Sequence, residues 1–131
     1  MIVSSCVARR GVPLIGMYSG TKAAQLAIAE AMRVELWGKQ IAVTTVHPVT
    51  TRTQFGKVAE EQGRAWMPGE ALVQTAEHVA RRMVRAMVRP TQEVWPSRIS
   101  RWVFGSATLM PRTFDWAMQG YLRRIEEFNQ R

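Results

Sequence analysis

The stretch MYSGTKAAQLAIAEAMRVELW, residues 17–37, decides the fold together with the segments on either side of it. Apolar residues fill most of its positions, which predicts a helix packed on most sides and ended by Gly38 as its C-cap. Before it, IVSS (residues 2–5) predicts the tail of a strand. After it, IAVTTV (residues 41–46) predicts a strand buried on both faces. Strand, loop, helix and strand form a βαβ unit with a right-handed crossover.

The remainder of the chain predicts further helices. Residues 54–74 show weak periodicity and contain three glycines and a proline, so we expect a loop with some helix. Thr75 is a suitable N-cap for a helix that Pro90 ends. The apolar residues of that helix recur at helical spacing: Ala76, Val79, Ala80, Met83, Val84 and Met87.

The last part predicts one short strand and two helices. The strand covers residues 93–95, and Ser97 is a candidate cap for a helix that Pro111 ends. Thr113 is a candidate cap for the final helix. The whole chain is then one partial domain, which divides into a βαβ core (1–53), a substrate loop (54–74) and C-terminal helices with a short strand (75–131).

Composition sets limits on the class of protein. The chain has 131 residues, enough for one domain. No stretch has the roughly 18 uninterrupted apolar residues of a membrane span. The single cysteine, Cys6, cannot form an internal disulfide, which favours a cytoplasmic setting. The net charge is +8, and its densest group is Arg81, Arg82, Arg85 and Arg89, which we interpret as the solvated face of one helix.

Three polar residues form a candidate proton-transfer site. Tyr18 and Lys22 are four residues apart at the start of a helix and therefore share one face. The ammonium of a nearby lysine favours the phenolate and lowers the pKa of a tyrosine. Ser5, thirteen residues before Tyr18, follows a strand at the sheet edge where ligands bind in open α/β sheets. These groups suit carbonyl reduction or alcohol oxidation.

The combination of these motifs resembles the short-chain dehydrogenase/reductase family. The matching text is IVSS (2–5), YSGTKAA (18–24), RVEL (33–36) and VHPVTTRT (46–53). The resemblance implies an α/β fold, the C-terminal portion of a doubly wound Rossmann-type parallel sheet with extra C-terminal helices. It also implies an enzyme that moves a hydride between NAD or NADP and a small-molecule carbonyl or alcohol, with NADP slightly favoured.

The same resemblance implies roles for individual residues. Tyr18 would be the general acid/base, Lys22 would lower its pKa and hydrogen-bond the nicotinamide ribose, and Ser5 would steady the substrate oxygen. The loop at Pro48 and Val49 would contact the nicotinamide end of the cofactor, as would two residues further along it, Thr51 and Thr53. No metal site, nucleic-acid partner or membrane span is expected, and the full-length form is expected to be a homo-oligomer.

Two departures from the family pattern limit the prediction. Val49 stands where the family usually has glycine, so we expect a reshaped nicotinamide loop. The glycine-rich turn that holds the pyrophosphate is absent from the sequence, as is the family's Asn-Ala-Gly motif. We therefore expect the cofactor-binding half to be missing and the chain alone to be inactive and without micromolar affinity for NADH or NADPH.

Two other functions stay open at this point. A non-catalytic module could pair with a full-length relative through the long alanine-rich helix, whose family counterpart commonly forms a dimer face. A basic binder of nucleic acid or membrane surfaces would need a continuous arginine patch, against which the scattered charges argue.

Several single residues favour plain structural readings. His47 and Cys6 are expected to be packed residues, not ligands or nucleophiles. For Thr53, the alternative to a cofactor contact is a structural role in a turn. Methionines of the later helices, Met83, Met87, Met110 and Met118, are expected in the core or beside an apolar substrate.

Overall fold

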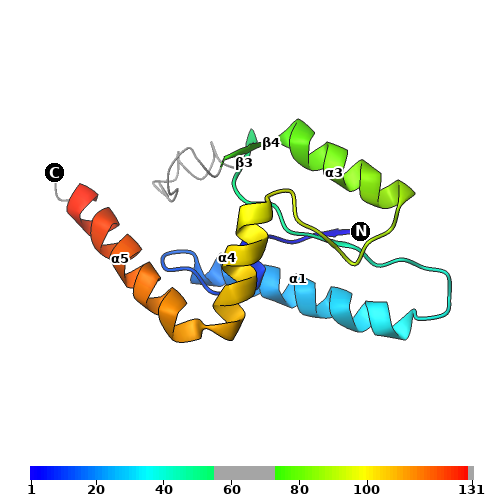
Figure 1. Ribbon diagram of the computed structural model, residues 1–131, viewed down its shortest axis with the longest axis horizontal. Coiled ribbons are helices and arrows are strands. Elements are labelled where there is room, and N and C mark those ends of the chain that lie inside the picture. Colours follow the sequence, from blue (N-terminus) through cyan, green and yellow to red (C-terminus); the bar gives the residue numbers. More distant parts are fainter. Residues whose placement is uncertain (55–72, 130–131) are drawn as a thin grey trace.

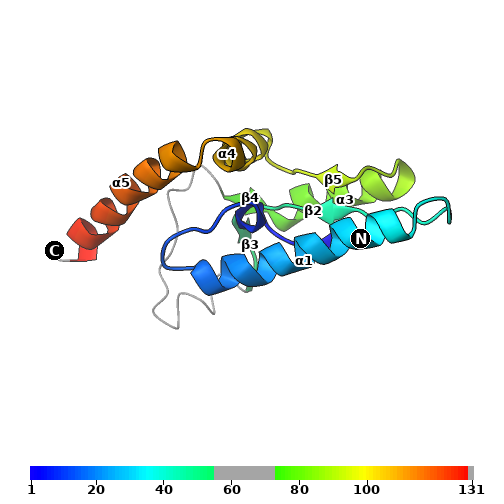
Figure 2. The same ribbon diagram turned by 90° about the horizontal axis from the view of Figure 1, so that it is seen from below.

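The computed structural model describes residues 1–54 and 73–129 and shows strands between helices (Figures 1 and 2). The elements follow in the order β1 (Ile2–Val3), η1 (Cys6–Ala8), α1 (Gly16–Glu35), β2 (Thr45–Val46), β3 (Thr51–Arg52), β4 (Gln74–Thr75), α3 (Ala76–Val88), β5 (Glu93–Val94), α4 (Arg98–Leu109) and α5 (Pro111–Asn129). Most of the predicted substrate loop, residues 55–72, lies outside the described residues.

A parallel sheet of order β1-β2-β5 forms the centre of the fold. Ile2 pairs with Thr45, which pairs with Glu93 on its other side. All three strands are two residues long, so the strand predicted over residues 41–46 is reduced to its last two. These two residues are the ones that pair with β1 on one side and with β5 on the other.

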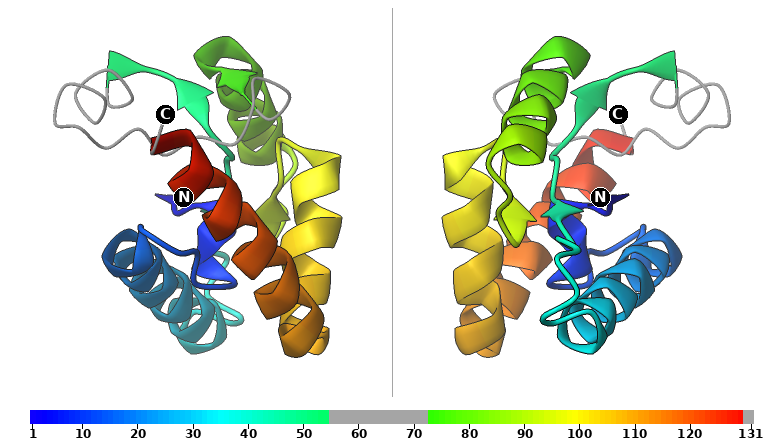
Figure 3. Two further views of the ribbon diagram at one scale, coloured as in Figure 1. Left: turned by 90° about the vertical axis from the view of Figure 1, so that its left-hand side faces the viewer. Right: turned by 90° about the vertical axis from the view of Figure 1, so that its right-hand side faces the viewer.

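Helices cover both faces of this sheet, with α1 on one side and α3 on the other (Figure 3). On the α3 side, a core cluster joins both layers and contains Val46, Val79, Ala86 and Val94, with Met83 packed against it. A parallel sheet with helices on both faces is the doubly wound arrangement that the sequence predicts.

The crossover helix α1 is less buried than the sequence predicts. Only Ser19, Leu26 and Ala29 are buried, and Val34 is 75% exposed. The sheet thus covers only one narrow face of the helix, and packing of its other face against a partner subunit stays a prediction. Gly38 is not the C-cap either: Leu36 holds that place, and Gly38 takes a left-handed φ of 81° in the turn beyond.

The caps of the later helices agree with the sequence in two cases out of three. The Thr75 hydroxyl accepts a bond from the His78 amide at 3.2 Å, and Ser97 caps α4 through the amide of Ser100. Thr113 was expected to cap the last helix, but α5 already begins at Pro111. Proline suits a first helical position, since it lacks only an amide that would have no partner within the helix.

The C-terminal helices pack on the rest of the chain through few residues. Phe114 of α5 is buried and its ring lies 5.9 Å from that of Phe104 in α4. Most of α5 is exposed, including Trp116 at 75%. Among the described helices, none is both long and apolar enough to cross a membrane.

Candidate active site

Ser5 lies at the tip of β1 and connects it to the following turn. Its side chain is buried, caps η1 and accepts a bond from the Val7 amide at 3.4 Å. Its hydroxyl is near enough to the side chains of Cys6 and Tyr18 to act to lower the pKa of each. The structure thus brings together Ser5 and Tyr18, two of the residues that the sequence singles out.

Lys22 joins the first turns of α1 to the tip of β1. Its Nζ lies 5.7 Å from the centre of the Tyr18 ring and donates to the carbonyl of Val3 at 3.2 Å. A second bond, to Oε1 of Gln25, is also 3.2 Å long. On the same side, the Ser4 hydroxyl donates to the carbonyl of Lys22 at 2.8 Å. Helix and strand are therefore fixed to each other at the point where the three candidate residues meet.

The electrostatics of Tyr18 differ from the sequence-based expectation. Burial raises the pKa of Tyr18, partly offset by its hydrogen bond with Ser5, and interaction with Cys6 raises it further. Burial also lowers the pKa of Lys22. The expected lowering of the Tyr18 pKa by Lys22 is not seen in this arrangement. The physical reason is that the phenol is partly removed from water, which disfavours its charged form.

Cys6 is a packed residue, as expected. It is 5% exposed, in a cluster with Val7 and Trp95. Burial raises the pKa of its thiol to about 11, against smaller opposing effects of hydrogen bonds with Ser5 and nearby backbone. A thiol with so high a pKa carries almost no thiolate at neutral pH and is a poor nucleophile.

The loop after β2 begins beside Ser5 and then leaves it. The Cys6 amide donates to the carbonyl of Pro48 at 3.0 Å, and Val49 packs against the same apolar cluster as Tyr18. The φ of Val49 is not positive, so valine replaces the expected glycine without backbone strain. Further on, Thr51 bonds the Val49 carbonyl at 2.9 Å within β3.

Thr53 lies beyond that strand and is exposed. Its hydroxyl donates to the carbonyl of Thr51 at 3.4 Å, a local contact of the kind that turn threonines make.

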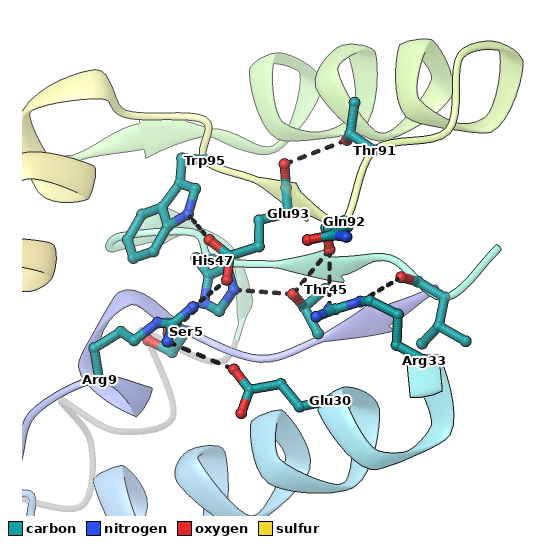
Figure 4. Close-up of polar contacts among 11 residues, drawn as sticks. Ser5, Arg9, Glu30, Arg33, Thr45, His47, Thr91, Gln92, Glu93 and Trp95 are labelled. Carbon is teal, nitrogen blue, oxygen red and sulfur yellow. Dashed lines mark hydrogen bonds and ion pairs between the residues drawn. The ribbon is translucent and has the colours of Figure 1, made fainter. Parts of the chain in front are cut away.

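His47 has a structural environment. It is fully buried, with Nδ1 at 3.2 Å from the carbonyl of Ser5 and Nε2 at 3.1 Å from Oγ1 of Thr45 (Figure 4). Its ring stacks on Trp95 with centroids 4.4 Å apart. Burial lowers the pKa of His47, against a smaller raising effect of the bond to Ser5. The histidine therefore holds the backbone of Ser5 in place, and within the described residues no group of three or more potential metal ligands occurs.

A polar network behind this histidine escaped the sequence analysis. Arg9 pairs with Glu93 of β5 and, at 3.5 Å, with Glu30 of α1 (Figure 4). The Trp95 indole donates to Oε2 of Glu93 at 2.8 Å. Burial acts to raise the pKa of Glu93, but this hydrogen bond, with Arg9, His47 and Arg33, brings it below its ordinary value. No spacing in the sequence indicates this network, because its members come from three separate elements.

Comparison with known proteins agrees with the motif. The sequence model of the family described as short chain dehydrogenase matches residues 1–64. A crystal structure of a short chain dehydrogenase from Burkholderia cenocepacia J2315 in complex with NADP is similar to the chain, with a TM-score of 0.66 and 23% sequence identity. The match covers 88% of this chain and 45% of that one. No match was found among curated proteins.

These findings confirm the predicted class. Residues 1–64 match the model of the short chain dehydrogenase family, and the fold is a partial Rossmann-like α/β arrangement. The chain spans about half the length of the NADP-bound relative.

Proposed function

We propose that the chain supplies the proton-transfer site of an NAD(P)-dependent oxidoreductase that interconverts a carbonyl and an alcohol by hydride transfer. The observation that carries this proposal is the Lys22 ammonium 5.7 Å from the centre of the Tyr18 ring, held at the tip of β1 where Ser5 is near enough to affect the pKa of Tyr18. The family match over residues 1–64 and the NADP bound by the solved relative support the same reaction class. We place this activity in the cytoplasm.

The mechanism follows from the three side chains. Tyr18 is protonated at neutral pH, since its pKa is raised above its ordinary value, so its hydroxyl can donate a proton to a substrate carbonyl oxygen. Ser5 donates a hydrogen bond to the same oxygen and stabilises its developing negative charge. The phenolate that remains is stabilised by the Lys22 ammonium, which exchanges one of its present bonds for that role.

The residues present fit one end of a dinucleotide cofactor. Lys22 and Tyr18 would hold the nicotinamide ribose, and the loop of Pro48, Val49 and Thr51 would contact the nicotinamide end, with Thr53 nearby. The fit rests on the Pro48 carbonyl, whose bond to the Cys6 amide keeps this loop beside Ser5. When bound, NAD(P)H would supply the hydride for carbonyl reduction, and the oxidised cofactor would accept it in the reverse direction. The sequence has no glycine-rich turn for the pyrophosphate, so the chain alone should bind neither NADH nor NADPH with micromolar affinity.

The chain offers a matched pair of variants to test this function, because it has only two tyrosines. The assay follows oxidation of NADPH or NADH with a panel of ketones and aldehydes, in the longest open reading frame that contains the chain. Tyr18→Phe should lower the rate by about a hundredfold or more, the range for loss of a general acid. Tyr121→Phe, in α5, should leave the rate unchanged.

Two results would contradict the proposed reaction. One is retention of the full rate by Tyr18→Phe. The other is the absence of carbonyl reduction in a folded polypeptide that does bind NADPH.

A second candidate function is pairing with a longer relative through α1. The observation in its favour is the open apolar face of this helix, where Ile28 is 57% and Met32 is 38% exposed beside small alanines. Sedimentation with and without such a relative tests it, using Ile28→Asp against Glu35→Asp as a control on the same helix. The paired species should be lost only with Ile28→Asp, and an unchanged sedimentation profile would reject the pairing. The same face would serve the homo-oligomer that we propose for the full-length form.

A further inference from the structure

A groove lies along β5 between α3 and α4, outside the candidate catalytic site. Its main part has a volume of about 730 Å³ and continues into a smaller part of about 250 Å³. The two parts share Arg82, Glu93 and Arg101. Figure 3 shows the two helices on either side of this strand. None of the lining residues belongs to the set that carries the proposed oxidoreductase activity.

Arginine dominates the lining of this groove. Five arginines from two helices contribute to its walls: Arg82, Arg85, Arg89, Arg98 and Arg101. In the part of the chain that the structure describes, all ion pairs involve Arg9 or Arg10, so none of these five guanidinium groups is neutralised by a carboxylate.

The one carboxylate in the lining does not offset this charge. Oε1 of Glu93 is paired with Arg9 and Oε2 accepts the indole bond of Trp95. The negative charge of Glu93 is thus neutralised by a sixth arginine, Arg9, at the end of η1. The residues that line the groove therefore carry an excess of about five positive charges, on side chains that are exposed to solvent.

The arginine group of α3 is solvent-exposed, as the sequence predicts, and part of it also lines the groove. From the sequence, Arg81, Arg82, Arg85 and Arg89 were expected to form a solvated helix face. In the structure three of them line the groove with two arginines of α4, while Arg81 stays outside it. The convergence of two helices concentrates charge that appears scattered along the chain.

Size and chemistry together indicate the class of ligand. The volume falls within the range of about 300–1,000 Å³ that is usual for small-molecule sites. Guanidinium groups bind phosphate oxygens through paired hydrogen bonds, and like charges gathered around a single carboxylate that is already paired with Arg9 favour an anion. Apolar side chains, Val84, Val88 and Val94, complete the wall. We propose that this groove binds a ligand with phosphate or pyrophosphate groups next to an apolar portion.

Inorganic pyrophosphate is the probe that tests the site, by calorimetric titration of the whole chain at low salt. Arg85→Gln with Arg101→Gln should weaken binding by about tenfold or more, since two charge-assisted contacts are lost. The matched control is Arg81→Gln with Arg112→Gln, which removes the same charge from exposed positions outside the groove. It should change affinity by about twofold or less, because neither side chain lines the groove and their interaction with a ligand there is screened. Circular dichroism verifies that each variant is folded. If the variant with Arg85→Gln and Arg101→Gln is not folded, the variant with Arg89→Gln and Arg98→Gln is used in its place.

A second part of the experiment tests whether the phosphate belongs to a lipid headgroup or to a free molecule. Vesicles of phosphatidylcholine with and without phosphatidylserine are sedimented with the chain. Binding to the anionic vesicles that pyrophosphate displaces, and that the groove variant loses, assigns the site to a lipid headgroup. Pyrophosphate binding without vesicle binding assigns it to a free phosphorylated molecule.

Three results would overturn the proposal. These are no saturable pyrophosphate binding by the folded chain, equal weakening in the groove and control variants, and binding of a glutamate-rich peptide in preference to pyrophosphate. None of them bears on Tyr18, so failure here is distinct from failure of the proposed reaction.

Discussion

The region around the β1 tip and the C-terminal helix α5 are stabilised in opposite ways. At the β1 tip, buried polar side chains connect elements far apart in sequence, as when His47 bonds the carbonyl of Ser5. In α5, one buried ring and one exposed ion pair, Arg10 with Asp115 at 2.5 Å, hold the helix to the rest. The contrast teaches that the candidate site lies in the part of the molecule where geometry is fixed most completely.

The largest expected difference between the two regions comes from introducing a charge. Val46→Asp places a carboxylate in the fully buried core of the sheet and should lower the free energy of unfolding by about 4 kcal/mol or more. The control Leu109→Asp lies at the end of α4, 83% exposed, and should cost less than about 0.5 kcal/mol. Urea denaturation measures both, and comparable losses would mean that the core does not lie where the structure has it.

A smaller difference is expected from the two ion pairs. Glu93→Gln removes the charge that neutralises Arg9 and should cost about 2 kcal/mol, because both side chains are mostly buried. Asp115→Asn removes the partner of Arg10 at the surface and should cost about 0.5 kcal/mol or less. Equal effects in urea denaturation would remove the distinction between the two regions.

Helix caps provide a finer test on the C-terminal side. Thr75→Ala should destabilise the chain by about 1 kcal/mol, since it leaves the His78 amide without its cap. Thr113→Ala lies inside α5 and should be nearly neutral or slightly stabilising. A loss of stability with Thr113→Ala instead would place the helix start where the sequence first predicted it.

The smallest expected effect is a change of stability with pH. Burial lowers the pKa of His47, so the folded state disfavours the imidazolium. The contribution of neutral His47 to the free energy of unfolding is complete above about pH 6.5, the ordinary pKa of histidine. This contribution is lost as the pH falls from there toward the lower pKa of His47 in the folded state. The lowered pKa of Glu93 adds a further loss of stability on acidification, at pH values below the ordinary pKa of a glutamate.

Urea denaturation at a series of pH values checks this dependence. His47→Gln should flatten the upper part of the curve, while His78→Gln, on α3, serves as the control. A wild-type curve that stays flat on acidification would show that His47 is not buried in its neutral form.

Local patterns in the sequence predicted the elements well, because each depends on neighbours along the chain. The crossover α1, the Thr75 and Ser97 caps and the short strand at Val94 are all of this kind. The spacing also predicted that Ser5, Tyr18 and Lys22 lie near one another, as they do, and their catalytic roles stay a prediction.

What sequence alone did not predict depends on contacts between distant elements. The pairing of Arg9 with Glu93 and Glu30 requires three elements to meet, and neither their spacing nor their type signals it. The extent of burial of α1 and the raised pKa of Tyr18 depend likewise on what covers each surface.

The bond from Lys22 to the Val3 carbonyl has a consequence for solubility. Among the described strands, β1 is an edge strand of its sheet. The backbone bonds between β1 and the β2 segment involve Ile2 and Ser4, so the carbonyl of Val3, which accepts the bond from Lys22, points away from β2. An exposed edge strand can pair with a strand of another polypeptide and start aggregation. A lysine at the edge opposes this pairing through its charge and hydration. Replacement of Lys22 by an apolar residue is thus expected to make the chain precipitate more readily, apart from any effect on chemistry.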